Sequence, residues 1–175
     1  MYTTKSYVTV YGISPELAED FEFDFDTEGI EQGRSDILTE LVPQLDSWND
    51  IGWLDVEEYE YDSAKKAITF VLETKWEPPL SWLKEASHHV YFQNKLITMT
   101  TIQKDETLVT GVAAMDGEIL QNKYIFEMSS EDVGKHYNDD EPDFELDDLD
   151  NEIWNSIEKF VNVCEQFYLE RESND

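Results

Sequence analysis

The carboxylates are the side chains of this sequence whose number and spacing could do chemistry, and two stretches concentrate them. One stretch lies near the N-terminus and comprises Glu22, Asp24, Asp26 and Glu28. In the other, nine of the fourteen residues from 139 to 152 are acidic: Asp139, Asp140, Glu141, Asp143, Glu145, Asp147, Asp148, Asp150 and Glu152. DNA-binding proteins hold phosphates with lysine and arginine, and fixed carboxylates can occupy the same cationic sites. We therefore take these acids as candidate partner-binding residues.

Both stretches combine the acids with apolar side chains that could hold them in place. Strict alternation from Phe21 to Asp26 predicts a strand that buries its phenylalanines and exposes acids about 6.6–6.8 Å apart, twice the strand rise. Apolar residues also interrupt the second stretch, which distinguishes it from a purely charged, disordered tail. Aromatic residues could add salt-resistant anchors, although each could equally belong to the core; the candidates are Tyr59, Tyr137, Phe144 and Trp154.

The overall charge restricts the class of partner. The chain has 175 residues, with 41 acids against 12 bases, and its formal net charge is −29. Long-range repulsion disfavours nucleic acid and anionic membranes as partners and favours basic proteins. The 40% hydrophobic and 13% aromatic content is too high for a disordered chain. We therefore expect a folded protein whose charged partner is cationic.

The charge is unevenly distributed along the chain. Residues 1–60 carry 16 acids and 2 bases, residues 61–128 carry 9 and 7, and residues 129–175 carry 16 and 3. A salt-adapted protein would be acidic throughout and poor in lysine, whereas the middle segment keeps seven lysines. The distribution instead indicates two anionic surfaces attached to an ordinary scaffold, at a cost in self-repulsion.

Signatures of catalysis, metals and cofactors are scarce. The chain has no Walker loop and no Gly-x-Ser-x-Gly or Gly-x-Gly-x-x-Gly motif, and His88, His89 and His136 lack a metal-ligand spacing. Cys164 is the single cysteine, so it can form neither an intramolecular disulfide nor a multi-cysteine zinc site. The acids at 24, 26 and 28 start like an EF-hand loop, but Ser35 stands where the bidentate Glu belongs. We expect no enzymatic activity, no cofactor and no metal.

The first half of the chain reads as strands and short helices. A strand is predicted over 6–11, and a helix should start at Ser14 and Pro15, which suit the N-cap and first helical positions. The alternating strand at 21–26 and a helix over 35–42 follow. Residues 53–61 and 67–74 should form a hairpin, with a polar turn between them.

The second half continues with a helix, three strands and a longer helix. Pro78 and Pro79 can open a helix, and strands are predicted over 95–102, 107–115 and 118–127. The pair Asp116-Gly117 is a strong hairpin-turn signal between the last two strands. After a polar linker, apolar residues from 146 to 168 recur at helical spacing, which predicts an amphipathic helix: Leu146, Leu149, Ile153, Ile157, Phe160, Val161, Cys164 and Tyr168.

The middle of the sequence resembles a known family. The run from Phe70 to Pro79 contains Thr74-x-Trp76-x-x-Pro79 and is followed by Leu83, Ser87, Gly111 and Gly117-Glu118-Ile119-Leu120. Over roughly residues 53–120 this pattern is similar to the YubB-like ferredoxin-like domain family of phage and plasmid proteins. The resemblance implies a ferredoxin-like α+β fold and a mobile-element origin. It supplies no catalytic residues.

Together these features lead to one set of expectations. The fold should be α+β, a ferredoxin-like antiparallel sheet over residues 1–128 with helices on one face, and the acidic linker and C-terminal amphipathic helix (129–175) should dock on the same domain. The expected function is inhibition by DNA mimicry, of the anti-restriction or anti-CRISPR type, against a basic DNA-binding host protein such as a nuclease. The alternative is a non-enzymatic adaptor or oligomerising scaffold that uses the C-terminal helix. The sequence lacks a signal peptide and an apolar span, so we expect a cytoplasmic monomer or homodimer.

Overall fold

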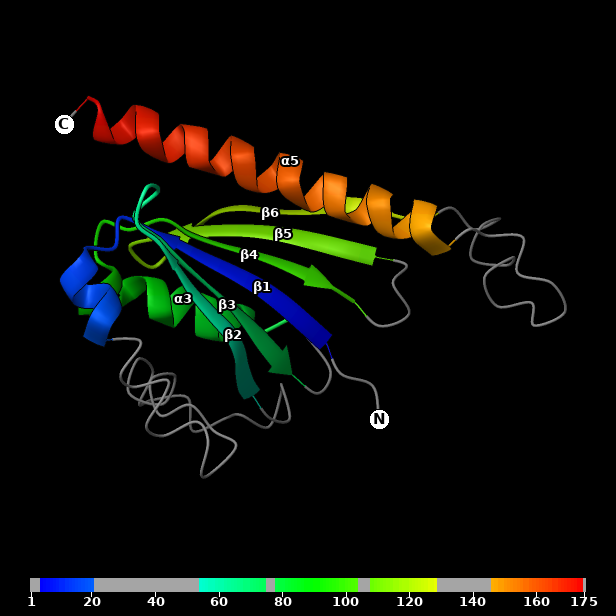
Figure 1. Cartoon of the computed structure of the whole chain (residues 1–175), viewed down its shortest axis with the longest axis horizontal. Coiled ribbons are helices and arrows are strands. Elements are labelled where there is room, and N and C mark those ends of the chain that lie inside the picture. The colour runs from blue at the N-terminus through cyan, green and yellow to red at the C-terminus, as the bar shows by residue number, and fades with distance from the viewer. Residues whose placement is uncertain (1–3, 21–53, 75–77, 104–107, 129–145, 175) are drawn as a thin grey trace, which may run out of the picture.

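A six-stranded antiparallel sheet organises the part of the chain that the computed structural model describes, which is residues 4–20, 54–74, 78–103, 108–128 and 146–174 (Figure 1). Its strands are β1 (Thr4–Tyr11), β2 (Leu54–Asp62), β3 (Ala67–Thr74), β4 (Ile97–Ile102), β5 (Leu108–Met115) and β6 (Glu118–Glu127). They lie in the order β2-β3-β1-β4-β5-β6. Each neighbouring pair is antiparallel. The N-terminal strand therefore lies inside the sheet, between β3 and β4.

Helices cover both faces of the sheet, so the structure has three layers (Figure 1). Helix α3 (Leu80–His88), the 3-10 turn η1 (Val90–Phe92) and the helical residues 15–20 pack on one face. Helix α5 (Leu146–Glu172) lies along the other face. On the α3 face, Trp82 is fully buried and meets Phe70 edge-on, with 6.2 Å between the ring centroids. No helix among the described residues is long and apolar enough to cross a membrane.

The predicted α+β class is confirmed, and most predicted elements occur within a few residues of their expected bounds. The turn at Asp116-Gly117 joins β5 to β6 with φ of 50° and 81°, the left-handed values that a two-residue hairpin turn requires. Six strands in the observed order are not the four-stranded sheet of a ferredoxin-like domain. The prediction of helices on one face holds for residues 15–20 and α3, whereas α5 covers the opposite face. The strand predicted at 21–26 and the helix predicted at 35–42 lie outside the described residues.

Helix α5 packs against β4, β5 and β6 through the apolar positions that the sequence pattern indicated. Ile153, Ile157, Phe160, Cys164 and Tyr168 are all buried. Two glycines allow close approach at this contact: a Cβ added to Gly111 would lie 2.9 Å from the Phe160 ring, and one added to Gly12 would meet the Tyr168 hydroxyl. The apolar side of α5 is therefore occupied by the chain's own sheet.

Two tyrosines beneath α5 predict a loss of stability at high pH. Burial raises the pKa of the Tyr11 hydroxyl, and Glu165 raises it further. Burial also raises the pKa of Tyr168, with added effects of the Glu172 charge and a hydrogen bond to Glu172. The neutral phenols are thus favoured in the folded state. Their stabilisation is fully present below the unfolded-state pKa near 10 and is lost as pH rises through the folded-state values.

We therefore expect the free energy of unfolding, measured by urea denaturation, to fall as the pH is raised from about 9 to about 11. The variant Tyr11→Phe cannot ionise at that position, so its stability should depend less steeply on pH in this window. Tyr91→Phe is the matched control, because it makes the same substitution at a side chain that is 45% exposed. A Tyr11→Phe slope equal to that of the unmodified chain would contradict the assignment.

Candidate protein-binding face

Helix α5 leaves half of its sheet face uncovered. It lies over β4, β5 and β6, whereas β1, β3 and β2 diverge from it (Figure 1). Tyr7, Thr9 and Thr69 lie half-buried in the uncovered half. Tyr7 and Tyr11 contact α5 through Trp154 and Tyr168, and Thr9 alternates with them along β1, so it points to the same side. This half-face is built on regular strands and is partly accessible, since Thr9 and Thr69 are half-buried whereas Ala67 and Val71 on the same side of β3 are buried.

Two contacts fix the border between α5 and the uncovered strands. The Trp154 ring meets the Tyr7 ring edge-on, with 5.0 Å between centroids and 75° between planes. About 16 Å further along the helix, the Glu165 carboxylate pairs with Lys65 in the β2–β3 turn, with 3.3 Å from Oε2 to Nζ. The ion pair is mostly exposed on the lysine side and adds little energy, but together the two contacts set the helix direction across the sheet.

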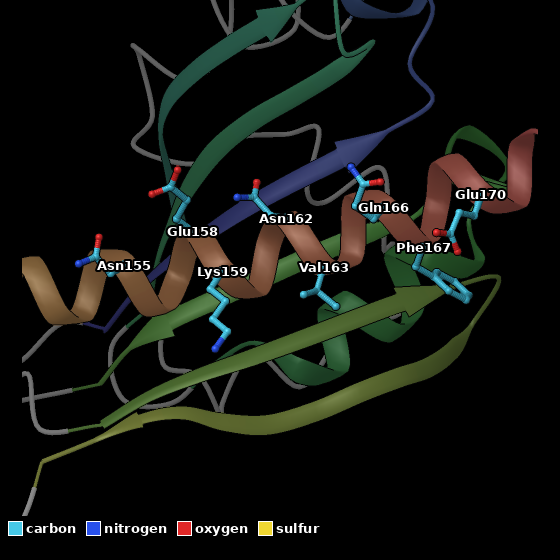
Figure 2. A pocket seen from close by; sticks show the side chains of 8 residues that line it. All are labelled: Asn155, Glu158, Lys159, Asn162, Val163, Gln166, Phe167 and Glu170. Carbon is cyan, nitrogen blue, oxygen red and sulfur yellow. The ribbon is translucent and has the colours of Figure 1, made fainter.

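Acidic side chains lie on both sides of this half-face. On β2, Glu60 is opposite Thr69 and Asp62 is opposite Ala67, which places both acids on the α5 side, and both are exposed. Glu158 is exposed on α5 and extends toward β1, away from Lys159 (Figure 2). We call Glu60, Asp62 and Glu158 the acidic face. Exposed carboxylates held on a strand and a helix present fixed negative charge to a basic surface.

The strand β2 carries its acids in an irregular geometry. The register with β3 shifts between Glu57 and Glu60, and Glu58 has φ of 53°, a bulge within the edge strand. Asp62 ends the strand, where its carboxylate accepts hydrogen bonds from the backbone N–H groups of Ala64 and Lys65 at 2.9 and 3.1 Å. Backbone hydrogen bonds therefore fix the position of the Asp62 carboxylate in the acidic face.

Most of the acids predicted from the sequence as partner-binding fall outside the described residues. These are Glu22, Asp24, Asp26, Glu28, Asp139, Asp140, Glu141, Asp143 and Glu145. Asp147, Asp148 and Asp150 lie in the first turns of α5, and their side chains are outside the described part of the chain. Glu152 is exposed on α5. The structure thus shows one of the thirteen as an accessible carboxylate on a regular element.

The aromatic anchor candidates have different outcomes. Tyr59 is half-buried, and its hydroxyl donates a hydrogen bond of 2.9 Å to the Ala18 carbonyl oxygen, so it supports the core. Trp154 is 45% exposed beside the acidic face and can contact a partner. Tyr137 and Phe144 lie outside the described residues.

The outer side of α5 forms a shallow hollow rather than a ligand pocket. All of its lining residues come from this one helix, so it has no opposite wall among the described residues (Figure 2): Asn155, Glu158, Lys159, Asn162, Val163, Gln166, Phe167 and Glu170. Within the described ranges no three His, Cys, Asp or Glu side chains gather into a group that could hold a metal ion.

Sequence reasoning missed the acidic face because its members come from separated segments. Glu60 and Asp62 fall in a predicted hairpin strand, and Glu158 falls in a predicted amphipathic helix. The available signal was the density of acids along 55–62, which includes Asp55, Glu57, Glu58, Glu60 and Asp62. Only the sheet order brings this strand to the edge that faces α5 across β1 and β3.

Comparisons with known proteins add no relative to this description: no family model, no curated protein and no solved structure matches the chain.

Proposed function

We propose that this protein is an acidic DNA mimic that inhibits a basic DNA-binding protein by occupying its DNA-binding groove. The observation that carries the proposal is the acidic face, in which carboxylates from β2 and α5 are exposed on ordered elements of a chain with a net charge of −29. Inhibitors of the anti-restriction and anti-CRISPR type, encoded by phages and mobile elements, are the class we propose. The site of action is then the host cytoplasm.

The physical basis is competition for cationic side chains. A DNA-binding groove presents lysines and arginines that normally neutralise phosphates. Another polyanion can pair with these side chains without reproducing the base contacts that recognise a DNA sequence. Carboxylates on a preformed surface lose little conformational freedom when they bind, in contrast to a flexible acidic tail. Because the attraction is electrostatic, association should be fast and should weaken as salt is added.

The adaptor alternative requires α5 to dock on a partner through its apolar side, and that side is not accessible in this structure. Ile153, Ile157, Phe160 and Cys164 are buried against the sheet of the same chain. Helix α5 leaves exposed a mixed surface of acids, such as Glu158 and Glu170, and apolar side chains, such as Val163 and Phe167. The burial of its predicted apolar side favours the mimic over an adaptor that docks through that side.

The finer description of the fold that we propose is a ferredoxin-like unit with an extension. Read from β4, the first four strands lie in the order β4-β1-β3-β2, with helical residues 15–20 after β1 and α3 after β3. This is the β-α-β-β-α-β arrangement of that fold. Strands β5 and β6 extend the sheet beyond β4, and α5 covers the face that these helices leave open.

Mimicry is tested by affinity capture from bacterial lysate at low and high salt, followed by elution with duplex DNA. We expect the retained proteins to be basic DNA-binding proteins, and we expect both salt and duplex DNA to release them. Each retained protein is then assayed for its own DNA binding in the presence of the purified chain. Retention of proteins that duplex DNA does not displace would contradict the proposal.

Neutralising the acidic face gives the sharper prediction. The triple variant Glu60→Gln, Asp62→Asn, Glu158→Gln should bind the captured target about tenfold more weakly, as expected for three exposed charges of about 0.5 kcal/mol each. The matched control removes three exposed acids on the α3 side of the molecule: Glu16→Gln, Glu19→Gln and Glu85→Gln. The control should bind nearly as tightly as the unmodified chain. Equal weakening in both variants would mean that net charge, not the acidic face, drives binding.

A further inference from the structure

The strand β6 is an exposed sheet edge. It ends the strand order, and no further strand lies beyond it in the sheet that the structure describes. Every residue from Glu118 to Tyr124 is exposed, and Tyr124 is exposed to 68%. Ile119 and Leu120 add apolar surface. A long edge with unpaired backbone groups is a template for pairing with another strand.

The two edges of the sheet are not alike. The edge strand β2 carries five acids, and charges at an edge are a device that prevents pairing. Bulges do not distinguish the two edges, because β2 shifts register with β3 after Glu57 and β6 shifts register with β5 at two places. The edge strand β6 has acids at its two ends, Glu118 and Glu127, and a single base, Lys123, between them. In a chain of net charge −29, β6 is the edge where another acidic molecule would meet the least repulsion.

The geometry points to a second copy of this chain as the partner of β6. Two copies pair their β6 strands antiparallel across a two-fold axis, so that the two six-stranded sheets become one continuous sheet. In the register we infer, Glu118 lies opposite Lys123 of the partner subunit, and Lys123 lies opposite Glu118 of the partner subunit. A two-fold contact makes each pair occur twice, which is why a strand with one acid and one base five residues apart is self-complementary.

The register follows from the side of the sheet on which these residues lie. Glu118 is opposite Met115 and Lys123 is opposite Gly111 on β5. Met115 belongs to the cluster beneath α5, and Gly111 lies against the Phe160 ring. Glu118 and Lys123 therefore share the α5 side and can meet across the junction. The fully overlapped register would set Glu118 against Glu127 of the partner subunit, but Glu127 is opposite Leu108 on β5 and so lies on the other side of the sheet from Glu118, which leaves Lys123 without an acidic partner.

Helix α5 contributes to the same junction. Lys159, Val163 and Phe167 extend from α5 on the side of β5 and β6 (Figure 2). Val163 and Phe167 are exposed to 53% and 50%. A two-fold axis at β6 brings the two α5 helices onto the same side of the continuous sheet, where these apolar side chains face each other. The dimer therefore buries apolar surface as well as backbone groups.

Self-association has a salt dependence opposite to that of the proposed inhibition. Each copy carries −29, so the two copies repel over long range, and added salt screens this repulsion. We expect sedimentation equilibrium of the full chain to show a dimer that is stronger at about 0.5 M salt than at about 0.05 M. Binding to a basic target weakens over the same range, so a failure of one proposal is distinguishable from a failure of the other.

Charge exchange at the junction tests the register. Glu118→Lys alone places two lysines opposite each other at both ends, and Lys123→Glu alone places two glutamates there. Each single variant should weaken the dimer about tenfold, and the double variant should restore it. Matched controls with the same change in charge lie away from β6: Glu60→Lys on β2 and Lys84→Glu on α3, both at exposed positions. Circular dichroism verifies that each variant is folded.

Ile119→Lys provides a second test that does not depend on the register, because it adds a charge to each strand at the edge itself. It should weaken the dimer while Glu60→Lys does not. A chain that remains monomeric at high salt and high concentration overturns the proposal. A dimer that Ile119→Lys leaves intact also overturns it, and so does a dimer that Glu60→Lys weakens as strongly as Glu118→Lys does.

Discussion

The variant Phe160→Ala is expected to lower the free energy of unfolding by about 3–5 kcal/mol, the usual cost of removing a buried phenylalanine ring. Phe160 is only 4% exposed, and its ring lies against Gly111 and beside the Ile125 side chain. The Lys123 ammonium lies 5.6 Å from the ring centroid, which adds a cation–π interaction. Because the ring is the largest side chain in the centre of the α5 contact, its loss leaves a cavity between helix and sheet.

Urea denaturation monitored by circular dichroism measures this effect. Phe167→Ala is the matched control when both variants are measured at low salt and low protein concentration, where the proposed dimer is dissociated, since it makes the same change on the same helix at a side chain that is 50% exposed. The control should cost less than about 1 kcal/mol, because little apolar area returns to water there. Equal losses in the two variants would show that α5 does not dock through the Phe160 side.

The second large effect is expected at Gly12, where alanine should lower the free energy of unfolding by about 2–4 kcal/mol. Gly12 follows β1 with φ of 86°, a left-handed conformation that costs other residues about 1–2 kcal/mol. An added Cβ would also run into the Tyr168 hydroxyl. Overpacking of this kind costs a further 1–3 kcal/mol or so. The C-terminal turns of α5 would have to move away from β1.

A double variant separates these two causes. Tyr168→Phe removes the oxygen that the new Cβ would meet, so Gly12→Ala combined with Tyr168→Phe should recover the steric part of the loss and keep the conformational part. The two substitutions should therefore be strongly non-additive in unfolding measurements. Simple additivity would mean that Tyr168 does not lie against Gly12.

Local signals in the sequence were sufficient to place most of the elements. Asp116-Gly117 located the turn between β5 and β6, because few residue pairs adopt two successive positive φ values. Pro79 marked the start of α3, where it stands at the N-cap. The spacing of Ile153, Ile157, Phe160, Cys164 and Tyr168 identified the side of α5 that is buried. Each of these signals depends on residues close together in the sequence.

The arrangement of the elements could not be obtained in the same way. Nothing within residues 4–11 indicates that β1 lies between β3 and β4, because that position is decided by pairing with residues more than fifty positions away. The sequence also did not determine which face of the sheet α5 covers, because β5 is apolar on both sides and could pack against a helix on either side. Long-range competition between possible pairings sets these features, and a local pattern does not encode it.

The same distinction between local signals and long-range arrangement applies to the candidate site. The sequence identified where acids are dense, and Glu152 on α5 is an exposed member of that set. It could not combine Glu60, Asp62 and Glu158, because their common surface exists only once β2 and α5 have taken their places around β1 and β3. Charge density is a property of composition, whereas a surface is a property of the sheet order.

The interior position of β1 has a consequence for synthesis on the ribosome. The strand is synthesised well before the two strands that it pairs with, residues 67–74 and 97–102. At about 5–20 residues per second, the nascent chain carries β1 for several seconds with both of its edges unpaired. Unpaired apolar strands recruit other chains. We therefore expect the chain to be prone to aggregation during translation, when the 16 acids of the first 60 residues add electrostatic repulsion between neighbouring nascent chains.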